Sequence, residues 1–474
     1  MVGQVSNLSA SWRILNLCIV ARWKKDSASV QCLLARGCRI GRRGPAGCRI
    51  ILTIEEASRA ASKKAPAMTA APQFADPLNQ VLNGHRAEFV PVAPVYECLG
   101  PLQFHRMALR WRKWRDSLDE AATDLLPVDY QNYLDLELEI HTDIIDHHYP
   151  PPAWLSLPTN MTPDQVAGCA VVRQGQGLFW LSADGEAAWM PPNREAYHEA
   201  LAADKTHHYA RLWERGDQDD LLARSGESRL HDPITAEPSP EQARAASERH
   251  EYQLARTLLA RYRGQLPLYY GCSSPYNTLL GLLGFQGMMH GLAERPEMVH
   301  RILESRLPRP SARLAALQRL GVGVMFVEEC LASADVISPR MYREFVFPYT
   351  RQALQFYEDR GFRTVLYFSG NLMPLLEDLR ALPFTALSFE EDRKGYGIDL
   401  AEVRRVLGPD RVLFGNLDAL FVEKALDQEV LDAVRRQIET AGAEGYFVVS
   451  LGSPFTPATS LDRIRLICES TLRV

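Results

Sequence analysis

The sequence predicts an α/β fold, namely a TIM-type (β/α)8 barrel with an inserted antiparallel hairpin region and an extra N-terminal segment. Short runs of consecutive apolar residues, which make strands that are apolar on both faces, alternate with amphipathic helical segments. This pattern is typical of a parallel sheet. No run is followed by a GxGxxG or Walker sequence. A doubly wound open sheet is therefore the less favoured alternative.

Seven candidate strands begin at residues 89, 266, 322, 364, 384, 411 and 446, and an eighth within the weakly patterned region would close the barrel. The run Val322–Val327 stops at Glu328 and Glu329, and Ser338 with Pro339 then predicts the start of a helix. Active sites of parallel α/β folds lie where the strands end. The two glutamates are therefore the first functional candidates.

Residues 1–67 differ in charge from the rest of the chain. They hold 12 Lys and Arg against three acidic residues, whereas the remainder holds 41 basic and 55 acidic residues. We expect an unstructured leader or a start assigned too far upstream, with Met68 as the real beginning. An organellar transit peptide and a four-cysteine metal site are the alternatives, although the cysteine spacings match no paired CxxC pattern. Residues 68–474 are expected to form a single barrel domain with an insertion at about 159–238.

Three stretches in the first half carry distinct patterns. Leu102–Leu126 predicts a helix over the barrel mouth or surface, and Cys169–Met190 alternates around two glycine turns as a hairpin does. Asp129–Pro158 holds residue types that bind metals. We expect a solvated helix end there, because the spacing fixes no third ligand; the residues concerned are His141, Asp143, Asp146, His147 and His148.

Composition excludes some partners. Residues 68–474 are acidic overall, and an acidic protein is a poor general binder of nucleic acid. The sequence also has no run of 18 apolar residues that would predict a membrane span. The cysteines after residue 67 are scattered, which favours a reducing compartment such as the cytoplasm. We expect a small-molecule substrate, and a homodimer is compatible with the sequence.

Several motifs together resemble the uroporphyrinogen decarboxylase superfamily over about residues 265–474. They are LLGFQGMMHGLAERPEMVHRILE, the SPRMYREFVFPY helix, a strand ending in SGN before LMPLLEDL, a strand ending in GNLD, and LGSPFTPATSLDRI. The resemblance implies a TIM barrel and one of two activities. The superfamily contains porphyrinogen decarboxylases and corrinoid-linked methyltransferases that activate thiols with zinc.

The departures from this family are informative. Where the methyltransferase branch has a His-x-Cys pair and a further Cys as zinc ligands, this chain has Tyr367, Ser369 and Ser453. Hydroxyl groups do not replace imidazole and thiolate for zinc, so we expect no metal and no cofactor. The decarboxylase branch carries an Arg-rich segment after its first strand, whereas residues 97–100 here read Glu-Cys-Leu-Gly.

The resemblance and the strand ends together predict a lyase that decarboxylates a porphyrinogen or a related carboxylated substrate without a cofactor. One of Glu328 and Glu329 should face the barrel interior and handle a proton, with Tyr367 as the other catalytic candidate. The candidate substrate-binding residues are Glu97, Tyr270, Asn371, Glu390, Asn416 and Asp418. Alternatively these acids pair with arginines at the rim. The alternative functions are a zinc-free methyltransferase-like barrel acting with a corrinoid protein, and a catalytically silent binding barrel.

Overall fold

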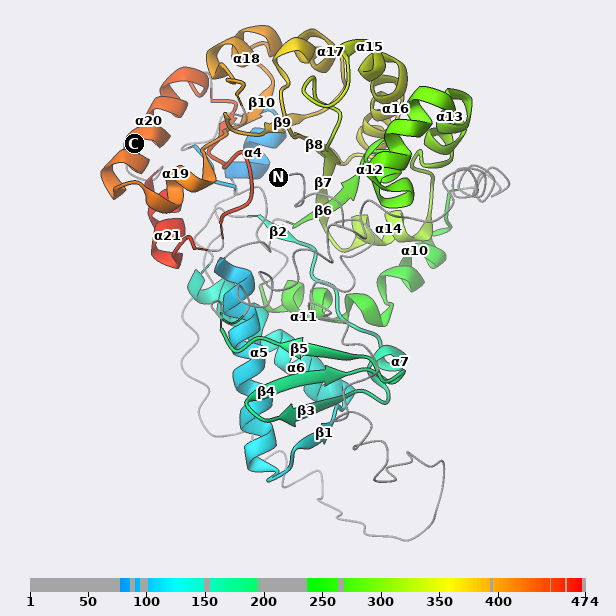
Figure 1. Cartoon of the computed structure of the whole chain (residues 1–474), viewed down its shortest axis with the longest axis vertical. Helices are drawn as coiled ribbons and strands as arrows, with labels where there is room; N and C mark the ends of the chain where they lie inside the picture. Colours follow the sequence, from blue (N-terminus) through cyan, green and yellow to red (C-terminus); the bar gives the residue numbers. More distant parts are fainter. Residues whose placement is uncertain are drawn as a thin grey trace.

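The computed structural model describes residues 77–85, 90–93, 101–148, 154–193, 196, 237–262, 268–392, 395–443, 445–456 and 458–470. The expectations for residues 1–67 and for Glu97 lie outside these ranges. The described chain has an upper body, in which helices surround a parallel sheet, and a lower lobe built from two long helices and a small antiparallel sheet (Figure 1).

The sheet of the upper body confirms the α/β prediction. Its strands run parallel in the order β11 (Phe447–Val448), β10 (Val412–Phe414), β9 (Ala386–Phe389), β8 (Arg363–Phe368), β7 (Val322–Glu329), β6 (Leu268–Ser273) and β2 (Leu155–Ser156). Beyond β11, Val92 forms a parallel bridge with Val449. The described residues therefore show a curled parallel sheet of seven strands, and no ladder among them joins β2 to residues 90–93.

Aromatic contacts across the interior show how strongly the sheet curls. The Trp154 ring, at the start of β2, lies 4.4 Å from Tyr269 of β6 and 5.4 Å from Phe414 of β10, measured between ring centroids. Four strands separate β2 from β10 in the sheet order. A flat sheet could not bring these side chains together, so the two sheet edges bend toward each other around an aromatic core.

Helix α4 (Pro77–Leu82) closes the amino end of this interior. Its side chains Leu78, Val81 and Leu82 belong to the same buried cluster as the inward-facing strand residues. The residues directly after α4 bind the starts of two strands: Arg363 donates to the Asn83 side chain, and Tyr446 donates to the Gly84 carbonyl. The carboxyl ends of the strands therefore form the other end of the interior.

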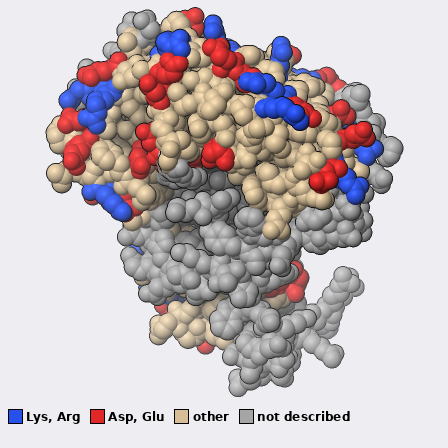
Figure 2. Space-filling view, turned by 45° about the horizontal axis from the view of Figure 1, so that its top comes forward, with Lys and Arg blue, Asp and Glu red and all other residues tan. Residues whose placement is uncertain are grey.

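Helices cover the outer face of the sheet. They are α12 (Asn277–Glu294), α13 (Pro296–Ser305), α14 (Ala312–Arg319), α15 (Pro339–Met341), the π-helical turn η2 (Tyr342–Val346), α16 (Phe347–Glu358), η3 (Met373–Leu375), α17 (Leu376–Arg380), α18 (Leu400–Leu407), α19 (Ala419–Lys424), α20 (Asp427–Ala441) and α21 (Leu461–Ser470). The predicted cap at Ser338 is confirmed, since its hydroxyl accepts from the N–H of Met341 at 3.2 Å. Acidic and basic side chains intermingle over the helices at the top of Figure 2.

The lower lobe confirms the predicted hairpin and extends it. Its antiparallel sheet has the order β1 (Leu125–Pro127), β3 (Ala170–Gln174), β4 (Gly177–Leu181) and β5 (Ala187–Met190). Helices α5 (Pro101–Glu120), α6 (Tyr130–His148) and the short α7 (Pro163–Val166) complete the lobe. The lobe thus begins well before residue 159, where we expected the insertion to start.

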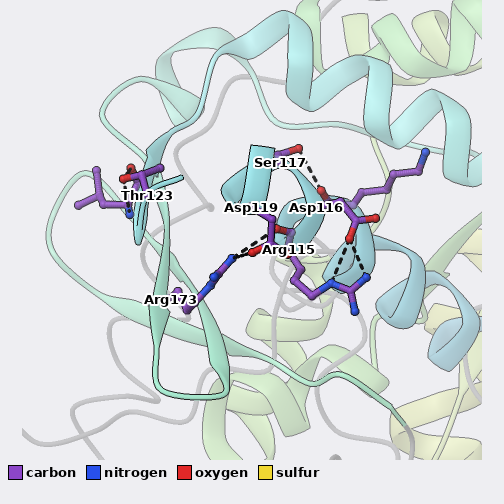
Figure 3. A network of polar contacts seen from close by, with 8 residues as sticks. Arg115, Asp116, Ser117, Asp119, Thr123 and Arg173 are labelled. Atoms are coloured by element: carbon purple, nitrogen blue, oxygen red, sulfur yellow. Dashed lines mark hydrogen bonds and ion pairs between the residues drawn. The ribbon is translucent and has the colours of Figure 1, made fainter. Parts of the chain in front are cut away.

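Helix α5 is fixed to this lobe by apolar and polar contacts. Trp114 packs edge-on against Trp180 of β4, with ring centroids 6.2 Å apart. On the polar side, Arg173 of β3 donates to the carboxylate of Asp119, and Arg115 pairs with its neighbour Asp116 (Figure 3). These contacts bind α5 to the antiparallel sheet, and Trp114 is buried in the lobe core.

Between the lobe and the upper body lie α10 (Pro240–Ser247), the short 3-10 helix η1 (His250–Tyr252) and α11 (Gln253–Arg261) (Figure 1). Ser239 caps α10, because its hydroxyl accepts from the N–H of Gln242. The chain turns between Glu248 and Tyr252, which separates α10 from α11.

The described side chains of the stretch of α6 that holds metal-binding residue types do not assemble a metal site. Burial lowers the pKa of His141 to about 4, and one ring nitrogen lies 2.8 Å from the Glu137 carbonyl oxygen. Asp143 pairs with His105, while Asp146 accepts from Tyr262. Across the described ranges, no three His, Cys, Asp or Glu side chains are arranged to hold a metal ion. The expected solvated helix end is wrong for His141, which is buried.

The helices are also short or polar relative to a bilayer. In the part of the chain that the structure describes, none combines the length and apolar character needed to span a membrane.

Candidate active site

The carboxyl end of β7 separates the two adjacent glutamates onto opposite faces. Val324 and Phe326 belong to the interior cluster, and strand alternation puts Glu328 on that same face. Glu329 lies on the helix side, where its carboxylate meets Ser274 and Thr350. Both glutamates are buried. Glu328 is therefore the interior member of the pair.

The strand register builds a polar layer around Glu328. Glu328 is level with Ser273 of β6 and with Tyr367 of β8, and Tyr367 is in turn level with Ser388 of β9. Two residues beyond Ser388 along the same face stands Glu390. Three neighbouring strands thus present an acid, a phenol and a second acid toward the interior at their carboxyl ends.

Glu390 is held by one of its two oxygens. Its Oε2 accepts from the Gly370 N–H at 2.8 Å and from the Tyr396 hydroxyl at 3.1 Å. Gly370 has φ +94, and a Cβ there would lie 2.2 Å from the Ser333 hydroxyl oxygen. Only glycine fits this position, so the loop after β8 presents its N–H to the carboxylate.

Tyr367 has its hydroxyl engaged. It donates to the carbonyl oxygen of Gly452 at 3.0 Å, which connects β8 to the loop after β11. Burial and the charges of nearby groups, Glu390 first among them, raise the pKa of Tyr367 well above its ordinary value. The phenol therefore stays protonated and acts as a fixed donor at this edge.

Cys330 lies within the same polar layer. Burial, followed by the charges of Glu328, Glu329 and Glu390, raises the pKa of its thiol well above the usual value, while the hydroxyl of Ser369 opposes the shift. The thiol remains neutral at physiological pH, so it is a poor nucleophile and a poor zinc ligand.

Two polar pairs at this end were missed by sequence reasoning. The Ser453 hydroxyl donates to Glu391 at 2.7 Å, and the Tyr396 hydroxyl donates to Glu390. The signal available was the acidic run Glu390–Asp392 directly after a buried strand. Asn416, a predicted binding residue, joins this edge, because its amide donates to the Glu390 carbonyl at 3.3 Å and accepts from Gln437.

Three other predicted binding residues have structural contacts instead. The Tyr270 side chain lies on the helix side, bound to Arg313 of α14. Asn371 folds back to accept from the N–H of Met373, and Asp418 is the N-cap of α19. Tyr270 therefore contacts α14, while Asn371 and Asp418 shape the ends of β8 and β10.

The alternative that the acids pair with arginines at the rim does not describe the hydrogen bonds of Glu329 and Glu390. Glu329 accepts from two hydroxyl groups, and Glu390 accepts from a backbone N–H and a phenol. Neutral donors of this kind stabilise a carboxylate less than an arginine does. The hydrogen-bond donors described for these two acids are therefore hydroxyl groups and a backbone N–H.

The methyltransferase branch has zinc ligands at three positions, and the residues that this chain has at those positions do not fit a zinc ion. Tyr367 and Ser453 donate their hydroxyl protons to the Gly452 carbonyl and to Glu391, and Ser369 interacts with the Cys330 thiol. Hydroxyls committed in this way offer zinc neither thiolate nor imidazole.

We expect protein purified without a chelator to contain far less than one zinc per chain. The reason is the hydroxyl set at Tyr367, Ser369 and Ser453. Elemental analysis by inductively coupled plasma mass spectrometry after dialysis would measure it. One zinc per chain surviving dialysis would refute the expectation and would redirect attention to the acids around Glu328.

The chain is similar in sequence to proteins of known function. The family model of uroporphyrinogen decarboxylase (URO-D) matches residues 225–473. The methylcobamide:CoM methyltransferase MtaA of Methanosarcina barkeri is 24% identical over 202 residues, covering 43% of this chain and 57% of that protein. The uroporphyrinogen decarboxylase of Myxococcus xanthus is 26% identical over 183 residues, covering 38% of this chain and 49% of that protein.

The chain thus spans about half the length of the curated relatives it matches. A solved methyltransferase from Methanosarcina mazei aligns over 84% of this chain and 97% of its own, with 17% identity and a TM-score of 0.46. Because the family model covers more than half of the sequence, the chain belongs to the uroporphyrinogen decarboxylase (URO-D) family.

Proposed function

We propose that this protein is a metal-free lyase that decarboxylates a porphyrinogen or a related carboxylated substrate. The observation that carries the proposal is the position of Glu328. It lies on the interior face at the carboxyl end of β7, level with Tyr367, and hydroxyl groups occupy the family's zinc-ligand positions. Relatives named uroporphyrinogen decarboxylase match over 37–38% of the chain and support this activity.

The reaction needs a proton at one defined moment. When the carbon–carbon bond to the carboxylate breaks, CO2 leaves and the electron pair remains on the substrate carbon. Glu328 in its acid form donates a proton to that carbon and becomes a carboxylate, which water then reprotonates. Its side chain is buried and lies on the interior face of β7, where this proton transfer would take place. The hydrogen bond from Tyr367 to the Gly452 carbonyl fixes the end of β8 to the loop after β11. The Gly370 N–H fixes the carboxylate of Glu390 at the same end of the interior.

The test is direct measurement of decarboxylation. Purified protein is incubated anaerobically with reduced uroporphyrinogen and with smaller carboxylated pyrroles, and CO2 and products with fewer carboxyl groups are quantified. We expect turnover that a chelator does not reduce. If no carboxylated substrate loses CO2, the proposal fails.

Methyl transfer is the second candidate, because three of the relatives are methyltransferases, one of them named for methylated thiols, and they match 43–44% of this chain. Under this candidate a separate corrinoid protein presents the methyl group. Loss of the methylcobalamin absorbance in the presence of a thiol would support it. A protein that binds a porphyrinogen yet is inactive in both assays would be the catalytically silent barrel.

A further inference from the structure

We infer that Glu329, on the helix side of β7, is a positioning residue that holds Glu328 in its working place. This inference rests on the proposed function, in which Glu328 handles the proton. Glu329 does not face the interior, so it acts through the backbone and through the elements packed against it.

The carboxylate of Glu329 joins three elements. Its Oε1 accepts from the Ser274 hydroxyl at 2.8 Å, and its Oε2 accepts from the Thr350 hydroxyl at 2.6 Å. Ser274 connects β6 to α12, while Thr350 belongs to α16. Both oxygens are occupied, so one side chain fixes the end of β7 against the end of β6 and against a covering helix.

The backbone carries this hold to the interior face. The N–H of Ser274 donates to the Glu328 carbonyl at 2.9 Å, and the N–H of Ser369 donates to the Glu329 carbonyl at 3.2 Å. The Ser274 hydroxyl also accepts from the N–H of Asn277 at 3.0 Å. A shift of the Glu329 side chain would therefore move the peptide of Glu328 and loosen the end of β8.

The surroundings of Glu329 contain other titratable groups but no described cation in contact with it. Tyr276 at the start of α12 and Tyr342 of η2 lie within electrostatic reach of Glu329, as does Cys330, which directly follows β7. Asp378 of α17 acts on Tyr342 from beyond. The Tyr342 hydroxyl is fully buried and has no hydrogen-bond partner among the described residues.

This environment makes the hold sensitive to pH. Burial raises the pKa of Glu329 to about 7, although the hydrogen bonds from Thr350 and Ser274 oppose the rise. Near neutral pH the carboxyl gains or loses a proton. Its charged form strengthens the two hydroxyl bonds but lies in a dry space beside phenols and a thiol. The strength with which Glu329 fixes the end of β7 to Ser274 and Thr350 therefore differs between its two protonation states.

Two variants test the inference. Glu329→Gln keeps the shape and removes the titration, whereas Glu329→Leu removes both hydrogen bonds. The matched control is Glu358→Gln, because Glu358 also accepts from two threonine hydroxyls, those of Thr364 and Thr385, at the opposite end of the sheet.

In kinetics, we expect the wild-type kcat to change around pH 7 and the Glu329→Gln variant to lose this change, with KM altered less than about twofold. Glu329→Leu should lower kcat by about 10- to 100-fold at a nearly constant KM, because small displacements of a reacting group lower the reaction rate strongly. Glu358→Gln should keep the wild-type pH profile. A Glu329→Gln profile identical to the wild type would overturn the inference.

Hydrogen exchange decides the matter independently of activity. In Glu329→Leu the peptides that contain residues 273–277 and 369–371 should exchange faster than in the wild type, and in Glu358→Gln they should not. If no decarboxylation is found, faster exchange still supports the positioning role. If decarboxylation is found and these peptides exchange at wild-type rates in Glu329→Leu, the inference fails while the proposed function stands. Should Glu329→Leu not fold, the kinetic comparison with Glu329→Gln still decides.

Discussion

Replacement of Glu328 by glutamine is expected to lower turnover by about 10²- to 10⁴-fold while the protein stays folded. Glutamine has nearly the same shape, so the interior face of β7 keeps its packing. It cannot donate a proton to carbon at the moment CO2 leaves. The loss should appear in kcat and kcat/KM equally, because the proton is delivered only in the transition state.

The matched control for this experiment is Glu377→Gln on α17. Glu377 is exposed and pairs only loosely with Arg380 at 3.7 Å, so the variant changes the net charge by the same amount without touching the interior. Turnover of the control should equal that of the wild type. Melting temperatures of all three proteins identify unfolding. A Glu328→Gln variant that is less stable and yet undiminished in every activity found would end the catalytic proposal.

The sequence predicts that one of Glu328 and Glu329 faces the interior, but it does not determine which one. Alternation along a strand predicts that Glu328 and Glu329 point to opposite faces, and the structure agrees. Which of the two points inward depends on how β7 faces the helices. Every residue of Val324–Glu329 is buried, so neither face is marked by polarity.

The inward-facing residue of the neighbouring strand β6 is equally hard to choose from the sequence. β6 begins with Leu268, Tyr269 and Tyr270, and its ladder to β7 shifts register between Leu268 and Tyr269. Tyr269 packs in the interior beside Trp154, and Tyr270 consequently faces α14. Two successive tyrosines give no pattern from which the inward one can be chosen.

Polar residues after a strand present a different ambiguity. Asn371 and Asp418 stand where ligand-binding residues of α/β folds occur, yet each accepts from backbone N–H groups at the start of the next helix. Asn and Asp are favoured at both kinds of position for the same chemical reason, a short side chain with an acceptor oxygen. Only the three-dimensional contacts separate a cap from a binding residue.

The lower lobe was the least predictable part. Its hairpin is predicted by turn residues in Cys169–Met190, whereas β1 adds to the sheet from a stretch that reads as the end of a helix. The decisive contact between α5 and α6 is an ion pair 27 residues apart in sequence: Arg110 donates to both oxygens of Glu137 at 2.7 and 2.6 Å. Spacing along the chain gives no hint of such a pair.

That ion pair leads to the second large expected effect. Glu137→Gln should destabilise the protein by about 3–5 kcal/mol, because the Arg110 charge would stay buried without its carboxylate. Arg110 is 9% exposed and Glu137 is 4% exposed. Burial alone would raise the pKa of Glu137, but Arg110 first, then His141 and Arg106, hold it below the ordinary value. A group with a lowered pKa stabilises the fold above its unfolded pKa, and this contribution fades as the pH falls.

The same two helices supply the control. Lys113 and Glu139 also pair between α5 and α6, but their side chains are 44% and 56% exposed. Glu139→Gln should therefore change the free energy of unfolding by less than about 1 kcal/mol. Urea unfolding of the wild type and both variants, followed by tryptophan fluorescence because Trp114 and Trp180 lie in this lobe, measures the difference at pH 7 and again at pH 4. The gap between Glu137→Gln and the wild type should narrow at pH 4, because the Glu137 carboxyl of the unfolded chain takes up a proton near its ordinary pKa while the folded one stays ionised. Equal shifts for the two variants at pH 7 would show that burial of the Arg110–Glu137 pair does not stabilise the lobe.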